Sequence, residues 1–297
     1  ATIESFTKPE DRVLDSKVML LHQKHPRGNA LIAEYMKRDY RVPKKNFEHF
    51  TYVSQLLQAE GMRKGIEAHR RAKPYCMGTL YWQLNDVYPV ASWSSRDNFG
   101  RWKALQYFAK EAYSPVVVLP KVEDNTLKIW ITSDLPMDTL GEINVEAVDF
   151  GGKLVFSQKT LDVRITPDSS RRAFQVYLPT LLKDNKPNNV AVEITLKMGG
   201  QTASHRIFYL VPIKDLSLPF VNIKKTVEQV NDGYLVKLYS DKLAKNVRLT
   251  SPIENGWFSN NYFDILPNRP MEVLLKTDRI LDNPAEQIKI LSLIETY

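Results

Sequence analysis

The pattern of apolar and polar positions changes near residue 115. Before that point, apolar residues recur at the spacing of amphipathic helices, whereas after it they alternate over short runs. The clearest helical stretch follows Asn46, a preferred N-cap residue, and ends before Lys73-Pro74. We therefore expect a helix from about Phe47 to Arg71. Its apolar stripe consists of Phe47, Phe50, Val53, Leu56, Leu57, Met62 and Ile66.

Three shorter helices are predicted in the same part of the chain. The first is expected to begin at Pro9 and to end before Pro26. The second, with Asn29 as its N-cap, covers residues 30–40. The third covers residues 101–112 and ends before Pro115.

A short apolar and aromatic run, Cys76 to Leu84, lies between the last two helices and carries no charge. This pattern predicts a strand buried on both faces, as in a parallel sheet or barrel, with Cys76 as a buried, inert thiol. Functional groups of barrels lie at the C-terminal ends of strands, so Trp82, Asn85 and Asp86 are candidates for a binding site. From residue type alone, packing of Trp82 in the core is the favoured interpretation.

From Val116 onward, turn residues separate short alternating runs, which predict two successive β-sandwiches of immunoglobulin-like type. The first is expected over residues 115–213 and the second over residues 214–297, with Pro212–Pro219 as the linker. Asn231-Asp-Gly233 is a hairpin signal in the second. The predicted runs are 128–132, 143–148, 154–156, 172–178, 190–196 and 206–211, then 221–223, 233–239, 247–250, 271–275 and 287–293.

Composition narrows the function classes. The chain has 297 residues, so two or three domains are expected, and its single cysteine excludes an internal disulfide or a multi-cysteine metal site. No apolar run has the length of a membrane span, and the N-terminal residues show no signal-peptide pattern. Residues 1–114 hold 19 Lys and Arg against 12 Asp and Glu, but the charges are mixed along helices. Nucleic-acid binding is therefore not expected.

Several polar and aromatic residues have competing interpretations. Asp86 is the one acidic residue at a predicted strand end, which makes it a candidate catalytic carboxylate from the residues alone. Trp257, in the aromatic loop 255–264, could stack on a sugar ring, although plugging the sandwich end together with Phe263 is favoured. His22 and His25 lack further metal ligands. His69 is expected to form structural hydrogen bonds, and ion pairs are expected for Glu60, Glu67 and Glu111.

One long ordered set of residues resembles a known family. The set comprises Gly65–Arg71, Pro74–Asp86, Pro89-Val90, Ser92–Ser95, Gly100 and Trp102–Leu105. It is similar to the end of the catalytic barrel of β-mannosidases in glycoside hydrolase family 2. The similarity extends upstream through Tyr35–Tyr40 and downstream into the β-rich part of the chain.

This resemblance implies a multidomain fold. Residues 1–114 would be the C-terminal segment of a (β/α)8 TIM barrel, with Cys76–Leu84 as its eighth strand, followed by the two sandwiches. Both catalytic glutamates of a retaining exo-β-mannosidase would precede Ala1, so no catalytic residue is expected in this chain, which would be silent alone. The resemblance also demotes Asp86 to positioning or structural hydrogen bonding and promotes Trp82 as the tryptophan that lines the sugar subsite, with Asn85 bonding to sugar hydroxyls.

The implied partner is a β-mannoside oligosaccharide or a glycan derived from a glycoprotein, without a cofactor or metal. A homodimer is compatible with the sequence. The compartment would be periplasmic or extracellular in a bacterium and lysosomal in an animal, with the targeting segment missing. Competing interpretations are a family 2 β-galactosidase or β-glucuronidase, and a carbohydrate-binding or bracing β-sandwich module without enzymatic activity.

Overall fold

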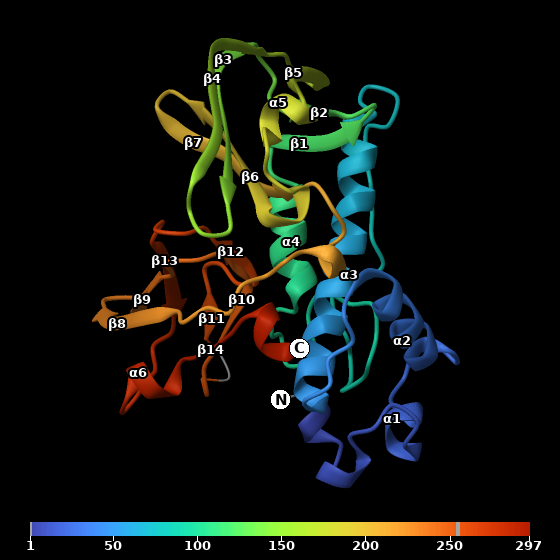
Figure 1. The fold of residues 1–297 in the computed structure, drawn as a ribbon. Helices are drawn as coiled ribbons and strands as arrows, with labels where there is room; N and C mark the ends of the chain where they lie inside the picture. The colour runs from blue at the N-terminus through green and yellow to red at the C-terminus, as the bar shows by residue number, and fades with distance from the viewer. Residues whose placement is uncertain (1, 254–255) are drawn as a thin grey trace.

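Helices and loops make up the first part of the chain, and strands dominate the remainder (Figure 1). This computed structural model describes residues 2–253 and 256–297. The helices of the first part are η1 (Ile3–Ser5), η2 (Pro9–Asp11), α1 (Lys17–Leu21), α2 (Gly28–Asp39), α3 (Phe47–Arg71) and α4 (Ala104–Ala112). The described residues before Val116 contain isolated β-bridges but no strand, so a barrel is not evident there.

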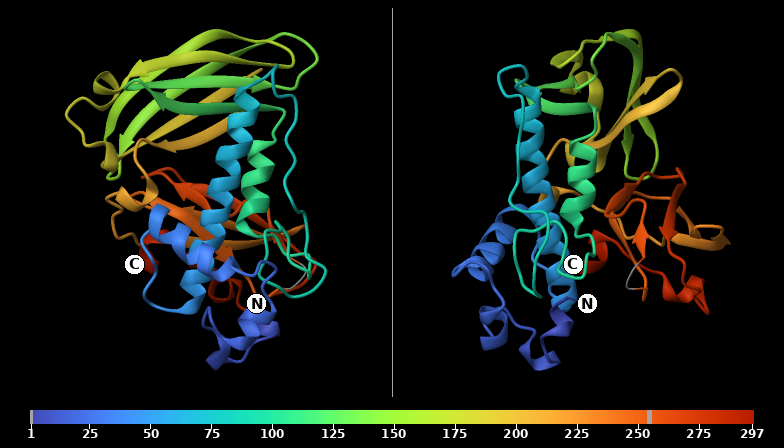
Figure 2. Two further views of the ribbon diagram at one scale, coloured as in Figure 1. Left: turned by 90° about the vertical axis from the view of Figure 1, so that its right-hand side faces the viewer. Right: turned by 180° about the vertical axis from the view of Figure 1, so that it is seen from behind.

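Helix α3 is the longest helix and runs beside α4 (Figure 2). The predicted cap is confirmed, because the Asn46 side chain accepts a hydrogen bond from the His49 backbone N–H at 2.8 Å. The predicted stripe also faces a core, with Val53 and Leu56 fully buried. The cluster that α2, α3 and α4 share includes Met36, Tyr52, Val53, Leu56, Ala59, Ala104, Leu105 and Phe108.

Two of the shorter predicted helices differ from the structure. The stretch from Pro9 to Pro26 holds only the short η2 and α1, since Leu20 and Leu21 remain exposed and a helix there gains little packing. Asn29 is not the cap of α2, which already begins at Gly28. The Asn29 side chain is buried and instead donates a hydrogen bond to the Leu14 carbonyl at 2.7 Å.

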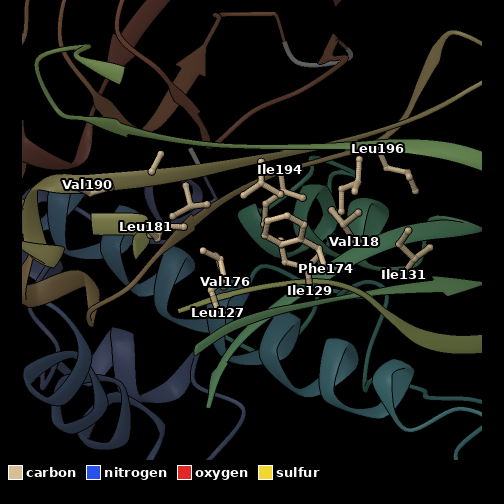
Figure 3. Close-up of a cluster of buried hydrophobic side chains, with 14 of the residues drawn as sticks. Val118, Leu127, Ile129, Ile131, Phe174, Val176, Leu181, Val190, Ile194 and Leu196 are labelled. Atoms are coloured by element: carbon tan, nitrogen blue, oxygen red, sulfur yellow. The ribbon is translucent and has the colours of Figure 1, made fainter. Parts of the chain in front are cut away.

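Two antiparallel sheets form the first sandwich. One has the order β1-β2-β5 and the other the order β4-β3-β6-β7. The strands are β1 (Val116–Glu123), β2 (Thr126–Ser133), β3 (Thr139–Asp149), β4 (Leu154–Ile165), β5 (Ser169–Tyr177), β6 (Val190–Met198) and β7 (Gln201–Tyr209), with α5 (Leu178–Leu182) and η3 (Pro187–Asn189) between β5 and β6. Figure 3 shows Ile129 and Phe174 of the three-stranded sheet near Ile194 and Leu196 of the other, within one buried cluster.

The second sandwich has the same construction from shorter strands. Its sheets have the orders β11-β13-β9-β8 and β12-β10-β14. The elements are η4 (Ile213–Asp215), β8 (Lys224–Val230), β9 (Gly233–Tyr239), β10 (Ala244–Thr250), β11 (Trp257–Phe258), β12 (Phe263–Ile265), β13 (Met271–Lys276), α6 (Pro284–Gln287), β14 (Lys289–Leu291) and η5 (Leu293–Thr296). The predicted hairpin is confirmed, with Val230 paired to Gly233 across a two-residue turn. At Gly233 the φ angle of 134° favours glycine, and a Cβ would lie 2.0 Å from the Leu275 carbonyl oxygen.

Helix α3 contacts both sandwiches. Near its start, the Tyr52 hydroxyl donates a hydrogen bond to the Asn246 carbonyl of the second sandwich. At its end, the Arg70 guanidinium lies 2.7 Å from the Asp134 carboxylate, directly after β2 of the first. A further apolar cluster, which includes Phe150 and Leu266, joins the two sandwiches directly. The helical part and the two sandwiches therefore share continuous packing.

Candidate functional site

The segment from Cys76 to Leu84 has no regular secondary structure and is not a buried strand, so that prediction is wrong. Leu80 is 98% exposed and Trp82 is 75% exposed, while Cys76 is half-buried. A strand buried on both faces needs neighbours on both edges and on both faces. Within the described part of the chain, no strand pairs with residues 76–82. The apolar pattern is therefore present without the partners that would bury it.

Backbone pairing orders the chain from Gln83 onward. The Arg96 N–H donates to the Leu84 carbonyl at 2.8 Å, and the Asp86 N–H donates to the Arg96 carbonyl at 3.2 Å. The Lys103 N–H then donates to the Ser95 carbonyl at 2.9 Å. Three short stretches, 83–86, 95–96 and 102–103, thus lie side by side immediately before α4 begins.

Asp86 is the last residue of the first of these stretches, and its side chain is buried, with 3% of the residue exposed. Its carboxylate accepts hydrogen bonds from the hydroxyls of Ser92 and Ser94, both at 2.6 Å, and forms a 3.0 Å ion pair with the Lys103 ammonium. The same ammonium donates to the Ser94 hydroxyl at 2.7 Å. This geometry suits a structural role that closes the loop between residues 86 and 103. Lys103 was not among the candidates from the sequence. Its one signal was that it lies within the Trp102–Leu105 match.

Replacing Asp86 with Asn is expected to lower the free energy of unfolding by about 2 kcal/mol, because the largely buried Lys103 ammonium loses its counter-ion. Urea unfolding of the purified chain measures this change. Asp138→Asn is the matched control, since it breaks an exposed pair with Arg164 and is expected to leave the urea midpoint unchanged. Equal midpoints for wild type and Asp86→Asn would contradict the structural role.

The other two candidates point into solvent. The Trp82 indole offers a flat apolar face and an N–H donor, which suits stacking on a pyranose ring. Asn85 is exposed as well, and its side-chain N–H lies 3.3 Å from the Asp86 carbonyl oxygen. Both side chains are accessible to a ligand, whereas Asp86 is not. Their substrate-binding roles stay predictions.

The remaining polar candidates are structural. His69 Nδ1 lies 2.6 Å from the Thr79 hydroxyl and ties the end of α3 to the exposed segment. Glu60 and Glu67 form the predicted ion pairs, both with Arg63 on the same helix. Glu111 has no ion pair among the described residues, so that prediction is wrong.

Trp257 neither points freely into solvent nor closes the end of the sandwich core. It belongs to β11, is 38% exposed, and its ring stacks on the ring of Trp102 at a centroid distance of 5.7 Å. Phe263 is buried in the core of the second sandwich, as expected. Asn255, part of the same predicted loop, lies outside the described residues. Sequence reasoning missed the Trp102–Trp257 contact because 155 positions separate the two residues.

Across residues 2–253 and 256–297, no three His, Cys, Asp or Glu side chains are grouped closely enough to hold a metal ion. None of the helices in these ranges has both the length and the apolar character needed to cross a membrane.

Both sandwiches match known domain families, and most of the chain is similar to β-mannosidases. A model described as a mannosidase Ig/CBM-like domain matches residues 125–215, and one described as an Ig-fold domain matches residues 218–296. A β-mannosidase of Capra hircus is 27% identical over 281 residues, which cover 89% of this chain and 32% of the relative. A β-mannosidase A of Aspergillus fumigatus is 25% identical and covers 98% of this chain and 36% of the relative.

A solved structure extends the similarity to the helical part. The β-D-mannosidase from Dictyoglomus thermophilum matches 98% of this chain and 35% of its own length, with a TM-score of 0.86 and 25% identity. The chain is a homologue of the β-mannosidases. The resemblance indicated by residues 65–105 is thereby confirmed. An Amycolatopsis orientalis exo-chitosanase, at a TM-score of 0.68 and 16% identity, shares the fold alone.

This β-mannosidase homologue spans about a third of the length of the curated relatives that it matches. Its two sandwiches correspond to the matched Ig-like domains. The activity and substrate of a whole relative therefore come to this chain only as proposals.

Proposed function

We propose that this chain is the C-terminal portion of a retaining exo-β-mannosidase, which removes terminal non-reducing β-D-mannose from oligosaccharides or glycoprotein-derived glycans. The observation that carries the proposal is the match of 98% of the chain to a β-D-mannosidase structure at a TM-score of 0.86. Residues 1–114 would end the catalytic domain, and residues 115–213 and 214–297 would be two immunoglobulin-like domains. The enzyme that would contain this chain is called the longer protein.

Exposed apolar side chains support assignment of the first part to a (β/α)8 barrel. Those between residues 75 and 88 are Tyr75, Met77, Leu80, Trp82, Leu84, Val87 and Tyr88. Exposed apolar side chains concentrated in one segment suggest a surface that another element covers. In the longer protein, adjoining barrel strands would pair with the backbone of residues 76–82 and cover Leu80.

The chemistry requires two carboxylates about 5–5.5 Å apart, one as nucleophile and one as acid/base. The buried Asp86 carboxylate bonds to two serines and to Lys103, and it is not available to a sugar. In keeping with the resemblance to β-mannosidases, we assign both catalytic glutamates to the part of the longer protein that precedes this chain. Trp82 would supply the stacking platform at the cleaved sugar, and Asn85 would bond to its hydroxyls.

Two other functions compete with this one. A β-galactosidase or β-glucuronidase would use the same architecture with different contacts to the sugar. A carbohydrate-binding module is the non-enzymatic alternative, and the name of the first matched domain family favours it. The large exposed aromatics of the described sandwich residues are Tyr177 of β5, Phe220 of the loop before β8, and Trp257 of β11, which share no strand. Bracing of the barrel is therefore the better assignment for the sandwiches.

Hydrolysis of chromogenic β-mannoside, β-galactoside and β-glucuronide tests the proposal. The purified chain is expected to release no chromophore above the buffer rate, because it lacks the catalytic pair. The longer protein is expected to hydrolyse the β-mannoside selectively. Turnover by the purified chain would contradict the placement of the glutamates, and selectivity for another sugar would support a competing function.

A further inference from the structure

Trp102 occupies the junction between the candidate sugar-binding segment and the second sandwich. Its ring stacks on that of Trp257 with an interplanar angle of 22°, and it meets Tyr107 of α4 edge-on at 5.1 Å. Trp102 is therefore held from two sides, by the helix that follows it and by a strand 155 positions away. Aromatic pairs in such arrangements contribute beyond the apolar area that they bury.

Strand alternation explains why Trp257 reaches out of its sandwich. Successive side chains of a strand point to opposite faces. In the two-residue β11, Phe258 is buried in the sandwich core, so Trp257 faces outward toward Trp102. The Lys276 ammonium, from the residue paired with Trp257 on β13, lies 5.3 Å from the centroid of the Trp257 ring. Trp257 is thus supported by its own sheet in the orientation that meets Trp102.

Short backbone steps connect Trp102 to the candidate site. Trp102 forms an antiparallel bridge with Arg96, which in turn forms a parallel bridge with Asn85. Asn85 is itself a candidate sugar ligand, and Trp82 lies three residues before it. The position of Trp102 therefore affects where the backbone that carries Asn85 and Trp82 lies.

The second sandwich also contacts the start of α4, next to Trp102, through hydrogen bonds. The Tyr262 hydroxyl donates to the Gln55 side-chain oxygen at 3.1 Å, and the same oxygen accepts from the Ala104 N–H at 3.3 Å. Ala104 is the first residue of α4 and lies two positions after Trp102. The second sandwich therefore contacts this junction both through a ring and through a hydrogen-bonded side chain.

We propose that the second sandwich fixes the backbone of the candidate sugar-binding segment through the stack of Trp257 on Trp102, which makes Trp257 a positioning residue. The contacts stand independently of any activity, whereas the consequence for sugar hydrolysis rests on the proposed function. In that function, the sandwich acts on the placement of Asn85 and Trp82 without touching the sugar.

Amide hydrogen exchange of the purified chain tests the proposal. In Trp257→Ala, the amides of Asp86, Arg96 and Lys103 are expected to exchange roughly three- to tenfold faster, because their pairing opens more often. The amides of Val236 and Val273, in the centre of the sandwich, are expected to keep their rates. Unchanged exchange at the first three amides, or equal acceleration at all five, would overturn the proposal.

Two further variants separate positioning from loss of stability. Trp257→Phe keeps a ring against Trp102 and is expected to restore most of the protection at the three amides. Phe220→Ala removes an 80% exposed aromatic that directly follows the linker and is the matched control, with no expected change. A Trp257→Phe variant as unprotected as Trp257→Ala would count against the stack.

The functional consequence is measured in the longer protein. Trp257→Ala is expected to lower kcat/KM for an aryl β-mannoside several-fold, with recovery in Trp257→Phe. If the longer protein hydrolyses no mannoside, the proposed function fails while the exchange result still decides the positioning role. If mannoside hydrolysis is normal in Trp257→Ala, the link from positioning to catalysis fails by itself.

Discussion

Replacing Trp82 with alanine is expected to lower kcat/KM of the longer protein for an aryl β-mannoside by about 10- to 100-fold. The change removes an apolar stacking face that we assign to the cleaved sugar, and a loss of about 1.4 kcal/mol in transition-state binding corresponds to a factor of ten. Steady-state hydrolysis of the chromogenic mannoside measures the effect. Trp82→Phe keeps a smaller ring, so its kcat/KM is expected to lie between those of the wild type and Trp82→Ala.

The fold is expected to survive this substitution. Trp82 is 75% exposed in the chain, and exposed substitutions usually change the free energy of unfolding by less than about 0.5 kcal/mol. Urea unfolding of the purified chain with and without Trp82 therefore serves as the control. Full activity of a folded Trp82→Ala enzyme would remove this residue from the site.

The second large effect is expected at Arg63, the centre of a buried charge network. Its guanidinium lies 2.5 Å from the Glu60 carboxylate and 3.8 Å from that of Glu67, and it sits 4.5 Å from the centroid of the Phe108 ring. Arg206, from β7 of the first sandwich, lies 3.3 Å from the same Glu67 carboxylate. One cluster of charges thus joins α3 to the first sandwich.

Arg63→Met is expected to lower the free energy of unfolding at pH 7 by about 4 kcal/mol, because it leaves the Glu60 carboxylate buried without its partner. Urea unfolding gives the value. The double variant Glu60→Gln, Arg63→Met is expected to recover part of the loss, since no unpaired charge remains at Glu60. Arg164→Met, which breaks an exposed pair, is the matched control. A loss below about 1 kcal/mol would show that the Arg63 pair contributes little.

The same network predicts acid sensitivity. Burial alone would raise the pKa of Glu60, but the nearby Arg63, Lys245 and Arg206 charges outweigh it and lower the pKa to about 2. A carboxylate with a lowered folded pKa stabilises the fold above its unfolded pKa and loses that contribution as the pH falls toward the folded value. Glu60 should therefore contribute about 3 kcal/mol that disappears between about pH 4.5 and pH 2. Urea midpoints of wild type and Glu60→Gln over this range check the assignment.

Local signals in the sequence were sufficient for some elements, although the predicted Asn29 cap was wrong. Asn46 marks the start of α3 through a cap that lies three residues from its donor, and Asn231-Asp-Gly233 marks a hairpin through the conformations that its turn requires. Most predicted strands of both sandwiches follow from alternation, but the strand predicted over residues 221–223 is wrong, because β8 begins only at Lys224. In contrast, β1 was missed because Pro120 interrupts its pattern, which the structure accommodates on an edge strand.

Other features depend on contacts that no local pattern encodes. Cys76–Leu84 has the composition of a buried strand, but composition cannot report whether neighbouring strands are present to cover Leu80. Asp86 was singled out as an acid at a predicted strand end, but it is buried, and its partner Lys103, 17 residues away, decides its role. The stack of Trp257 on Trp102 depends on the packing of a sandwich against a helical unit, which is set by tertiary structure.

The contacts of α3 limit how this architecture can be recombined. Tyr52 donates a hydrogen bond to Asn246 of one sandwich, and Arg70 pairs with Asp134 beside the other. A single helix therefore contacts specific residues of both. A sandwich transplanted from a distant relative would bring its own residues to positions 134 and 246, where α3 would no longer find its partners. The natural unit for building chimeric enzymes is therefore the whole of residues 47–297, and the visible boundary near Pro212 is a poor place to cut.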